Sequence, residues 1–318
     1  MYFETIQKLH SDILSNINKV LYGKEKEITL IVCAMLCRGH VLLDDVPGTG
    51  KTALARALAL SVDSDCKRVQ FTPDLLPSDI TGINFYNQKE NEFVFRRGPL
   101  FTNILIADEI NRTTPRTQSA LLESMNEFQA TIDGVTHKIE EPFFVIATQN
   151  PIESQGTFPL PEAQTDRFMI KLSLGYPDRV SEKKMLDEYK QKDPFSEIRA
   201  VCTKSDIISA YDLVRAVTVS DIIKEYIIDI ITAVRESDKI RLGASPRATL
   251  ALMRTAQAYA AISGRDYVIP DDVKEVAVPV LSHRIIRRAQ NTLKFADTNE
   301  VVIEYILDTV EAPIGQYN

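Results

Sequence analysis

The chain has 318 residues, of which 44% are hydrophobic and 25% are charged, and its formal net charge at pH 7 is −7. This composition allows two packed units with ample cores and excludes a largely disordered chain. No apolar stretch approaches the roughly 20 residues of a membrane-spanning helix, and residues 1–10 lack the basic start and apolar core of a signal peptide. We therefore expect a cytoplasmic protein with no direct membrane insertion.

Two helices and a strand are the first elements expected along the chain. Apolar residues at helical spacing predict helices over 2–21 and 25–37, and the apolar run from Val41 to Leu43 predicts a buried strand. A turn with two glycines follows. The helix expected after the turn has four residues at helical spacing: Ala53, Leu54, Ala57 and Leu58. In this order of strand, turn and helix, the free amides at the helix start attract phosphate.

The turn itself carries the side chains that a nucleotide-binding loop needs. The proline and glycines within 47–50 bend the backbone so that its amides face inward. Lys51 would reach the β- and γ-phosphates and the Thr52 hydroxyl would hold Mg²⁺, as in the G-x-x-x-x-G-K-[ST] motif. Asp45 departs from that motif by standing at its first glycine. A turn without a ligand needs neither the lysine nor the threonine, so we predict a phosphate loop.

A second apolar run, from Asn103 to Ala107, stops at Asp108 and Glu109. Two carboxylates at the end of a buried strand are costly unless they have a use. Phosphoryl transfer depends on positioning and on stabilisation of charge. We therefore predict that Asp108 binds Mg²⁺ through water and that Glu109 polarises the attacking water.

A third apolar run, from Phe143 to Ala147, leads into polar residues that end at Asn150. Three near-continuous apolar runs separated by helical segments imply a parallel sheet buried on both faces. Ligands bind outside the carboxyl ends of the strands in such a sheet. Lys51, the two carboxylates and Asn150 would therefore form one site, with Asn150 orienting the water beside the γ-phosphate.

Further elements are expected between and after these strands. Hairpins are predicted over 84–95 and over 130–139, the second turned by Asp133-Gly134, and a strand is predicted over 168–174. The charged segment 179–203 is interpreted as a linker. Helices are expected over 206–216, 220–236, 246–262 and 270–286.

Longer motifs stand out around these elements. Besides the phosphate loop they are LIADEINR (105–112), TQSALLESMNE (117–127), ATQNPIESQGTFPLPEAQTDRF (147–168), GASPRA (243–248), FTPDLLPSDITG (71–82) and FRRGPLFTN (95–103). As a set they resemble the MoxR family of AAA+ ATPases, and the resemblance covers nearly the whole chain. The family tolerates an acidic residue at the position of Asp45.

The resemblance implies an α/β fold in two parts. A P-loop AAA+ domain, with a buried parallel sheet between helices, would span 1–178 and a linker 179–203. A smaller all-helical lid domain would span 204–318. ATP and Mg²⁺ would be the cofactors of an ATPase that self-associates into a ring, usually a hexamer. The two hairpins would face the pore or a client, although ordinary surface hairpins remain an alternative.

The resemblance also assigns residues to the ATPase site. Asn150 matches the first sensor, Arg247 the second sensor in the lid, and Arg167 the arginine finger offered to a neighbouring subunit. Gly23 matches the stretch that encloses the adenine together with the lid. The expected nucleotide contacts are Gly23, Pro47, Gly48, Thr49, Gly50, Lys51, Thr52 and Ala53, and the expected Mg²⁺ ligands are Thr52 and Asp108.

Two of these arginines have support that is independent of the resemblance. Arg247 follows a Ser-Pro pair typical of a helix start, where a cation opposes the helix dipole unless it reaches an anion. Arg167 precedes the last predicted strand, so it lies near the start of that strand and out of reach of its own nucleotide. The alternative for Arg247 is an ordinary surface arginine, and the alternative for Arg167 is a structural salt bridge. Arg112 and Arg116 are rival candidates for subunit contacts.

Three functions fit these observations. The first is an ATP-driven, chaperone-like remodeller that helps partner proteins mature, often proteins with a von Willebrand factor A domain in this family. The second is a motor or loader acting on nucleic acid, which a net charge of −7 disfavours because affinity for phosphate backbones is largely electrostatic. The third is a scaffold that binds nucleotide but barely hydrolyses it, which would leave Glu109 and Asn150 idle. We expect protein partners and no nucleic acid.

Two remaining features are expected to be structural. The basic cluster 283–288, with Lys294 beyond it, fits a solvated helix face or a contact with a neighbouring subunit or acidic partner, and no aromatic residues interleave it. The cysteines show no zinc spacing and are expected to be reduced packing residues. They are Cys33, Cys37, Cys66 and Cys202.

Overall fold

A parallel sheet forms the centre of the protein. The computed structural model describes residues 2–46, 48–150, 156–190, 193–288 and 298–315. The sheet has five strands in the order β2-β5-β8-β1-β9, and each neighbouring pair is parallel. The strands are β1 (Val41–Asp44), β2 (Cys66–Gln70), β5 (Ile104–Asp108), β8 (Phe144–Gln149) and β9 (Ile170–Leu172). Their carboxyl ends therefore meet at one edge.

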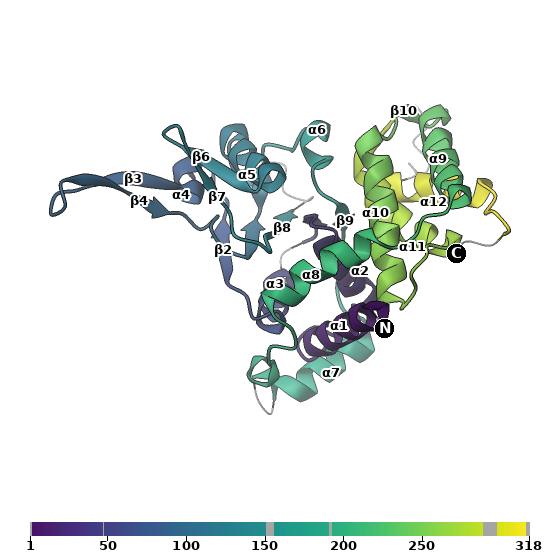
Figure 1. Ribbon diagram of the computed structural model, residues 1–318, viewed down its shortest axis with the longest axis horizontal. Coiled ribbons are helices and arrows are strands. Elements are labelled where there is room, and N and C mark those ends of the chain that lie inside the picture. The colour runs from purple at the N-terminus through teal and green to yellow at the C-terminus, as the bar shows by residue number, and fades with distance from the viewer. Residues whose placement is uncertain (1, 47, 151–155, 191–192, 289–297, 316–318) are drawn as a thin grey trace.

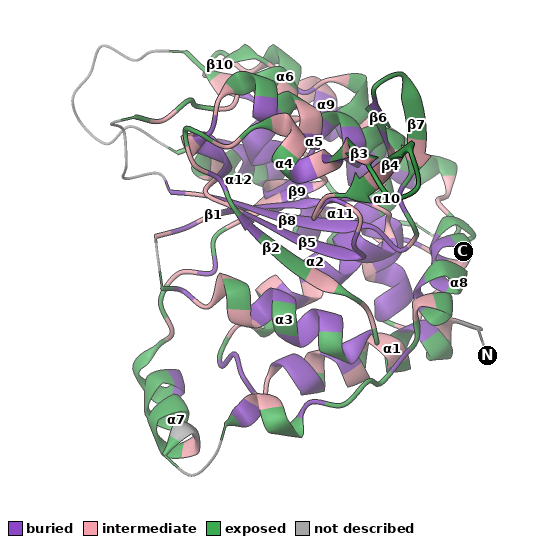
Figure 2. Cartoon of the chain, turned by 90° about the vertical axis from the view of Figure 1, so that its left-hand side faces the viewer, coloured by how far each residue is buried: buried purple, intermediate pink, exposed green. Residues whose placement is uncertain are grey.

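The inner strands are buried on both faces, as their near-continuous apolar runs predict. Along β1, Val41 and Leu43 belong to one hydrophobic cluster and Leu42 belongs to another. Helices cover both faces of the sheet (Figure 2). The first cluster includes α1 (Tyr2–Ile17), α2 (Glu25–Leu36) and α3 (Lys51–Ser61), and the second includes α4 (Pro77–Thr81) and α5 (Pro115–Glu127).

Both predicted hairpins are confirmed, and they project from the side of the sheet away from the C-terminal helices (Figure 1). The first pairs β3 (Gly82–Asn87) with β4 (Glu92–Arg97), and the second pairs β6 (Gln129–Ile132) with β7 (Val135–Lys138). Asp133 and Gly134 turn the second hairpin with positive φ angles of 49° and 81°. Gly134 adopts this conformation without steric cost.

A group of helices follows the α/β part, so the predicted α/β fold with a helical lid is confirmed. These helices are α8 (Lys204–Arg215), α9 (Asp221–Glu236), α10 (Pro246–Ile262), α11 (Pro270–Leu281) and α12 (Asn299–Thr309). The lid also contains a short antiparallel strand pair, β10 (Ile240–Leu242) and β11 (Ile286–Arg287). Helix α10 packs against α1 and α2, and the first hydrophobic cluster runs without a break into the lid.

The segment 179–203, predicted as a linker, contains regular structure. Helix α7 (Arg179–Tyr189) begins at an Asp178 cap, whose carboxylate accepts a hydrogen bond from the Ser181 amide at 2.7 Å, and the 3-10 helix η2 (Pro194–Glu197) follows. Other short helices are α6 (Glu162–Thr165) and the 3-10 helices η1 (Ile110–Arg112) and η3 (Ser282–Arg284). The linker interpretation therefore missed a helix at the carboxyl edge of the sheet.

The prediction of a solvated helix face over 283–288 is wrong. Helix α11 ends at Leu281, and His283 and Arg284 are buried, with 9% and 7% of their surfaces exposed. The Arg284 guanidinium donates to the Asp166 carboxylate at 2.7 Å and to the Phe168 carbonyl at 2.6 Å. These bonds satisfy a buried cation, so part of the basic cluster ties the lid to the segment before β9. Lys294 lies outside the described residues.

Within the described ranges, no helix is both long and apolar enough to cross a membrane. The four cysteines are free, and burial raises the pKa of the Cys37 thiol to about 12 and that of the Cys66 thiol to about 11. These thiols therefore stay protonated at neutral pH, in agreement with reduced packing residues.

Candidate active site

The phosphate loop joins β1 to α3 at the carboxyl edge of the sheet. Gly48 and Gly50 have φ angles of 87° and 91°, a region that glycine adopts readily. Helix α3 begins at Lys51, and its N-cap residue, Gly50, has no side chain to cap the first amides. A Cβ atom added to Gly48 would meet nothing within 4 Å, so the loop faces open space there. Uncapped amides at the start of a helix of this length suit a phosphate group.

The Lys51 side chain contacts the backbone of the phosphate loop. Its Nζ donates to the carbonyl of Asp45 at 3.0 Å and to that of Val46 at 3.2 Å, so the ammonium lies over the loop backbone. Thr49 is buried, while Thr52 is exposed on the first turn of α3, next to Ala53. Pro47 lies outside the described residues. The loop therefore presents a cation, a hydroxyl and free amides at one place.

Asp108 and Glu109 lie at the end of β5, and Thr148 holds both of them. Its hydroxyl donates to Asp108 Oδ1 at 2.6 Å and accepts from the Glu109 amide at 2.9 Å. Glu109 has a positive φ of 58°, a conformation that costs a non-glycine residue about 1–3 kcal/mol. Thr148 is fully buried. Sequence reasoning missed Thr148 because, of the polar residues that follow the third apolar run, it assigned a role to Asn150 alone.

Other side chains also contact the two carboxylates. Arg68 on β2 donates to Asp108 Oδ2 at 2.6 Å, and Gln70 on the same strand donates to Glu109 Oε2 at 2.8 Å. Arg112 donates to the same Glu109 oxygen at 2.9 Å. Arg112, named above as a rival for subunit contacts, therefore pairs within its own chain. None of the sequence motifs included Arg68 or Gln70, because β2 has no long apolar run.

Asn150 directly follows β8, which lies between β5 and β1 in the sheet. It is 6% exposed, and the Asn111 amide donates to its backbone carbonyl at 3.4 Å. Because β5, β8 and β1 are parallel neighbours, Asn150 lies at the same edge as the carboxylates and the phosphate loop. The four residues that the sequence grouped therefore share one edge of the sheet.

Asp45, the departure from the general motif, has a structural task. Its carboxylate is buried and accepts three hydrogen bonds from the segment after β9: from Ser173 Oγ at 2.8 Å, the Leu174 amide at 2.6 Å and the Gly175 amide at 2.9 Å. A glycine at this position could form none of these bonds. The acidic residue thus fixes the start of the phosphate loop to the connection that leads into α7.

Gly23 lies against that same connection. It has a φ of 67°, and an added Cβ atom would lie 2.4 Å from Ser181 Oγ on α7. Lys24 donates to the Tyr176 carbonyl at 3.1 Å, and the Lys184 ammonium lies 5.1 Å from the centre of the Tyr22 ring. Helix α7, predicted as part of a linker, therefore borders the stretch that was expected to enclose the adenine.

Arg167 and Arg247 both line a cavity of about 460 Å³ that we call the arginine groove. It is lined in part by Arg38, Arg167, Arg215, Arg247, Arg254 and Arg284. Gly39 and His40 also line it, and they precede β1, whereas the phosphate loop follows that strand. The groove therefore lies at the amino edge of the sheet. The four residues of β1 lie between this edge and the phosphate loop and span about 13 Å. Arg116 is not among its lining residues.

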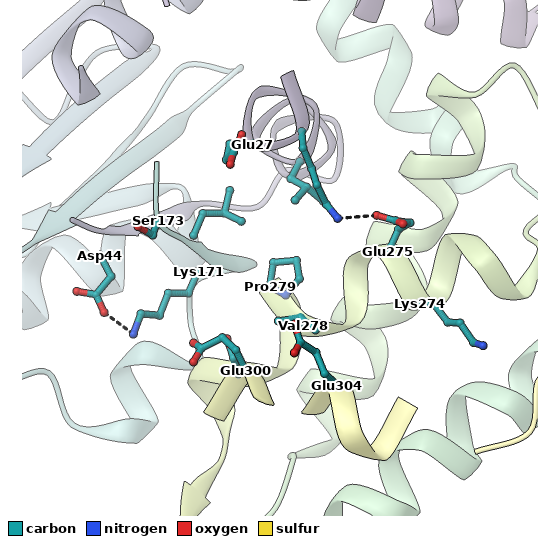
Figure 3. A pocket seen from close by; sticks show the side chains of 14 residues that line it. Glu27, Asp44, Lys171, Ser173, Lys274, Glu275, Val278, Pro279, Glu300 and Glu304 are labelled. Atoms are coloured by element: carbon teal, nitrogen blue, oxygen red, sulfur yellow. Dashed lines mark ion pairs between the residues drawn. The ribbon is translucent and has the colours of Figure 1, made fainter. Parts of the chain in front are cut away.

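A further cavity of about 450 Å³ lies between α2, β9, α11 and α12 (Figure 3). Two ion pairs border it: Lys171 with Asp44 at 2.5 Å, and Lys26 with Glu275 at 2.9 Å. Glu27, Glu300 and Glu304 add negative charge to its lining. Of the residues predicted for the nucleotide site, none that the structure describes lines this cavity.

The donor set at the carboxyl edge suits a magnesium nucleotide. Mg²⁺ prefers hard oxygen ligands and keeps several of its waters, which one carboxylate and one hydroxyl from the protein permit. Asp108 and Thr52 provide these oxygens, and the uncapped start of α3 suits the phosphates. The residues present therefore fit the two groups that the sequence predicts.

The fold and this edge define an AAA+ ATPase, and comparisons with known proteins agree. The family described as ATPase family associated with various cellular activities (AAA) matches residues 40–170, and the AAA lid domain matches residues 232–304. A crystal structure described as a candidate ATPase from Cytophaga hutchinsonii has a TM-score of 0.91 and 38% identity, and covers 98% of this chain and 97% of that one.

Relatives narrow this class to one family. Chaperone MoxR1 of Mycobacterium tuberculosis is 37% identical, over 93% of this chain and 80% of that protein. Protein MoxR of Paracoccus denitrificans is 31% identical, over 86% of this chain and 87% of that protein. The uncharacterized protein YeaC of Bacillus subtilis is 47% identical over 98% of both chains. The chain therefore belongs to the MoxR family of AAA+ ATPases.

Proposed function

We propose that the protein hydrolyses ATP with Mg²⁺ at the carboxyl edge of its sheet and uses that energy to remodel partner proteins. The observation that carries the proposal is the grouping of Lys51, Asp108 and Glu109, with both carboxylates fixed by the Thr148 hydroxyl. Mg²⁺ would neutralise the charge that develops on the phosphates. A scaffold that only binds nucleotide would not need Glu109 held in a strained conformation.

Each residue of the edge has a role in this proposal. The amides at the start of α3 and the Lys51 ammonium bind the β- and γ-phosphates, and Thr52 and Asp108 hold the metal ion. Glu109 accepts a proton from the attacking water, and Asn150 orients that water. Glu109 Oε2 accepts hydrogen bonds from Gln70 and Arg112, so Oε1 is the oxygen that would take up this proton. A neighbouring subunit would supply the charge that is missing beside the γ-phosphate.

We assign that charge to the arginine groove of the next subunit in a ring, which we expect to be a hexamer. Arg167 and Arg247 come from distant parts of the sequence, and both line the groove at the amino edge. Among the described residues, neither side chain makes an ion pair or a hydrogen bond, whereas Arg284, which also lines the groove, is paired with Asp166. Placed against the γ-phosphate of a neighbour, an arginine finger contributes about 10³ to 10⁵ in rate.

Partner proteins are the proposed substrates of this motor, among them proteins with a von Willebrand factor A domain. The name Chaperone MoxR1, carried by a relative, supports a chaperone-like role. The projecting β3–β4 hairpin carries exposed aromatic side chains suited to contacts with a client, including Phe93, which is 73% exposed. The acidic net charge of −7 argues against a motor on nucleic acid.

The test of the proposed activity is ATP binding and turnover of two variants. Lys51→Ala should lose ATP binding, because the phosphate charges are no longer compensated. Glu109→Gln should bind ATP but hydrolyse it about 100-fold or more slowly, since an amide cannot accept the proton. Lys224→Ala, which removes a lysine paired with Asp221 on the lid surface, is the control and should behave as the wild type. Undiminished turnover in Glu109→Gln would remove this residue from catalysis.

The same slow variant tests the partners. Glu109→Gln should keep a client bound in the presence of ATP, so more client should co-purify with it than with the wild type. Lys51→Ala, which does not take up ATP, is the matched control. Equal recovery of proteins on both variants would argue against ATP-dependent remodelling.

A further inference from the structure

The edge strand β2 holds both carboxylates of the proposed site from one side. Arg68 and Gln70 are two residues apart on this strand, so their side chains point to the same face. In the parallel register, Arg68 lies opposite Ile106 and Gln70 lies opposite Asp108. Arg68 therefore reaches forward along β5 to Asp108, while Gln70 reaches the next residue, Glu109.

The contact between Arg68 and Asp108 is made by two nitrogens. Nη2 and Nε of the guanidinium lie 2.6 Å and 3.2 Å from the same oxygen, Asp108 Oδ2. Nη2 also lies 3.1 Å from Gln70 Oε1, and Gln70 Nε2 donates to Glu109 Oε2 at 2.8 Å. A chain of hydrogen bonds thus connects Arg68 with both acids.

The two partners of the ion pair differ in how firmly they are held. The Asp108 side chain is 14% exposed, and its other oxygen accepts the Thr148 hydroxyl at 2.6 Å. The Arg68 side chain is 51% exposed, and among the described residues its hydrogen bonds go to the side chains of Asp108 and Gln70, at the carboxyl ends of β5 and β2. Arg68 can therefore swing into solvent, whereas Asp108 stays in place.

We propose that Arg68 is a positioning residue that competes with Mg²⁺ for Asp108 and so sets the Mg²⁺ concentration at which the site takes up nucleotide. This inference rests on the proposed ATPase function. The guanidinium occupies the oxygen that a metal-bound water would use, and its charge repels an approaching cation. With Arg68 in place, the charge of Asp108 is neutralised before Mg²⁺ arrives, as Arg112 neutralises that of Glu109. Without Arg68, the Asp108 carboxylate attracts Mg²⁺ more strongly.

The test is equilibrium binding of a fluorescent ATP analogue to the full chain over a series of free Mg²⁺ concentrations. In Arg68→Gln, the half-saturating Mg²⁺ concentration should fall about two- to fivefold, the range that fits a half-exposed ion pair. Affinity for the analogue at saturating Mg²⁺ should change little. Arg68→Lys keeps the charge and should stay closer to the wild type.

Lys67→Gln is the matched control. Lys67 is the neighbouring residue of β2, points to the opposite face, and donates to the Phe101 carbonyl at 3.2 Å. The variant removes the same charge from the same strand, so its Mg²⁺ midpoint should equal that of the wild type. If Lys67→Gln and Arg68→Gln shift the Mg²⁺ midpoint equally, the effect comes from net charge alone and the proposal is overturned.

Two other outcomes separate this inference from the proposed function. If Arg68→Gln binds the analogue with an unchanged or higher Mg²⁺ midpoint, Arg68 does not compete with the metal ion. If the wild type fails to bind the analogue at any Mg²⁺ concentration, the ATPase proposal itself fails. If the Mg²⁺ midpoint of Arg68→Lys is as low as that of Arg68→Gln, the role assigned to the charge is also contradicted. Circular dichroism verifies that each variant is folded.

Discussion

Replacing Asp45 by alanine should destabilise the fold strongly. Asp45 is 3% exposed, and its carboxylate accepts hydrogen bonds from the Ser173 hydroxyl and from the amides of Leu174 and Gly175. The variant removes the acceptor and leaves three donors without it. The connection from β9 to α7 would then lose its attachment to the phosphate loop.

The size of the effect follows from the exposure of each donor. The Leu174 amide is buried, and an unsatisfied buried donor costs about 2 kcal/mol. Ser173 and Gly175 are more exposed and can bond to water, so we take about 1 kcal/mol for each. Relief from burying a carboxylate offsets part of this cost. We therefore expect Asp45→Ala to lower the free energy of unfolding by about 2–4 kcal/mol.

Urea unfolding followed by circular dichroism measures this difference. Ser173→Ala is the control, because it removes one exposed donor and leaves the two amide bonds to Asp45; it should cost about 1 kcal/mol or less. A free energy of unfolding for Asp45→Ala within about 0.5 kcal/mol of the wild type would refute the reasoning, since surface substitutions have effects of that size.

Three further predictions follow from buried groups and from charge. Thr148→Val keeps the shape of a buried side chain but removes the hydroxyl that fixes both carboxylates, so turnover should fall about tenfold or more while ATP binding persists; wild-type turnover would contradict this. Burial lowers the pKa of His40 to about 4, whereas in the unfolded chain the same imidazole has a pKa near 6.5. The stability that the neutral imidazole contributes is therefore present above about pH 7 and is lost as the pH falls from there toward 4. Between pH 7 and pH 5, the free energy of unfolding measured in urea should fall by about 2 kcal/mol more for the wild type than for His40→Gln. Equal decreases in the two proteins would argue against this role of His40. Finally, the acidic chain should not bind duplex DNA at physiological salt; a micromolar dissociation constant that weakens steeply with salt would favour the nucleic-acid motor.

The central strands could be predicted because burial on both faces leaves a continuous apolar signature. The runs that became β1, β5 and β8 each end at a polar residue, and the parallel arrangement brings those ends to one edge. Strand β2 gave no such signal, since as an edge strand it exposes Lys67, Arg68 and Gln70. The contacts of Arg68 and Gln70 with the acids were therefore out of reach of pattern reasoning.

The periphery of the molecule was harder to predict for a similar reason. Helix α7 is polar and largely exposed, so its sequence was interpreted as a linker, and α12 was not predicted. Arg284 appeared to be a solvated residue because its partners, Asp166 and the Phe168 carbonyl, are more than 100 positions away in the sequence. Arg167 and Arg247 line the same groove because tertiary packing places the lid beside the amino edge of the sheet.

The central claim is that one ATPase site is completed by the arginine groove of a neighbouring subunit, and mixing inactive variants tests it most directly. Arg167→Ala and Lys51→Ala should each be inactive alone, while Arg167→Ala should still bind ATP. Mixed, they should regain some turnover, because a Lys51→Ala subunit offers an intact Arg167 to the intact phosphate loop of its neighbour. A mixture of Arg167→Ala with Arg247→Ala is the control and should stay inactive, since both changes affect the same groove. Mixtures of the first kind that demonstrably co-assemble yet stay as inactive as either parent would contradict the account.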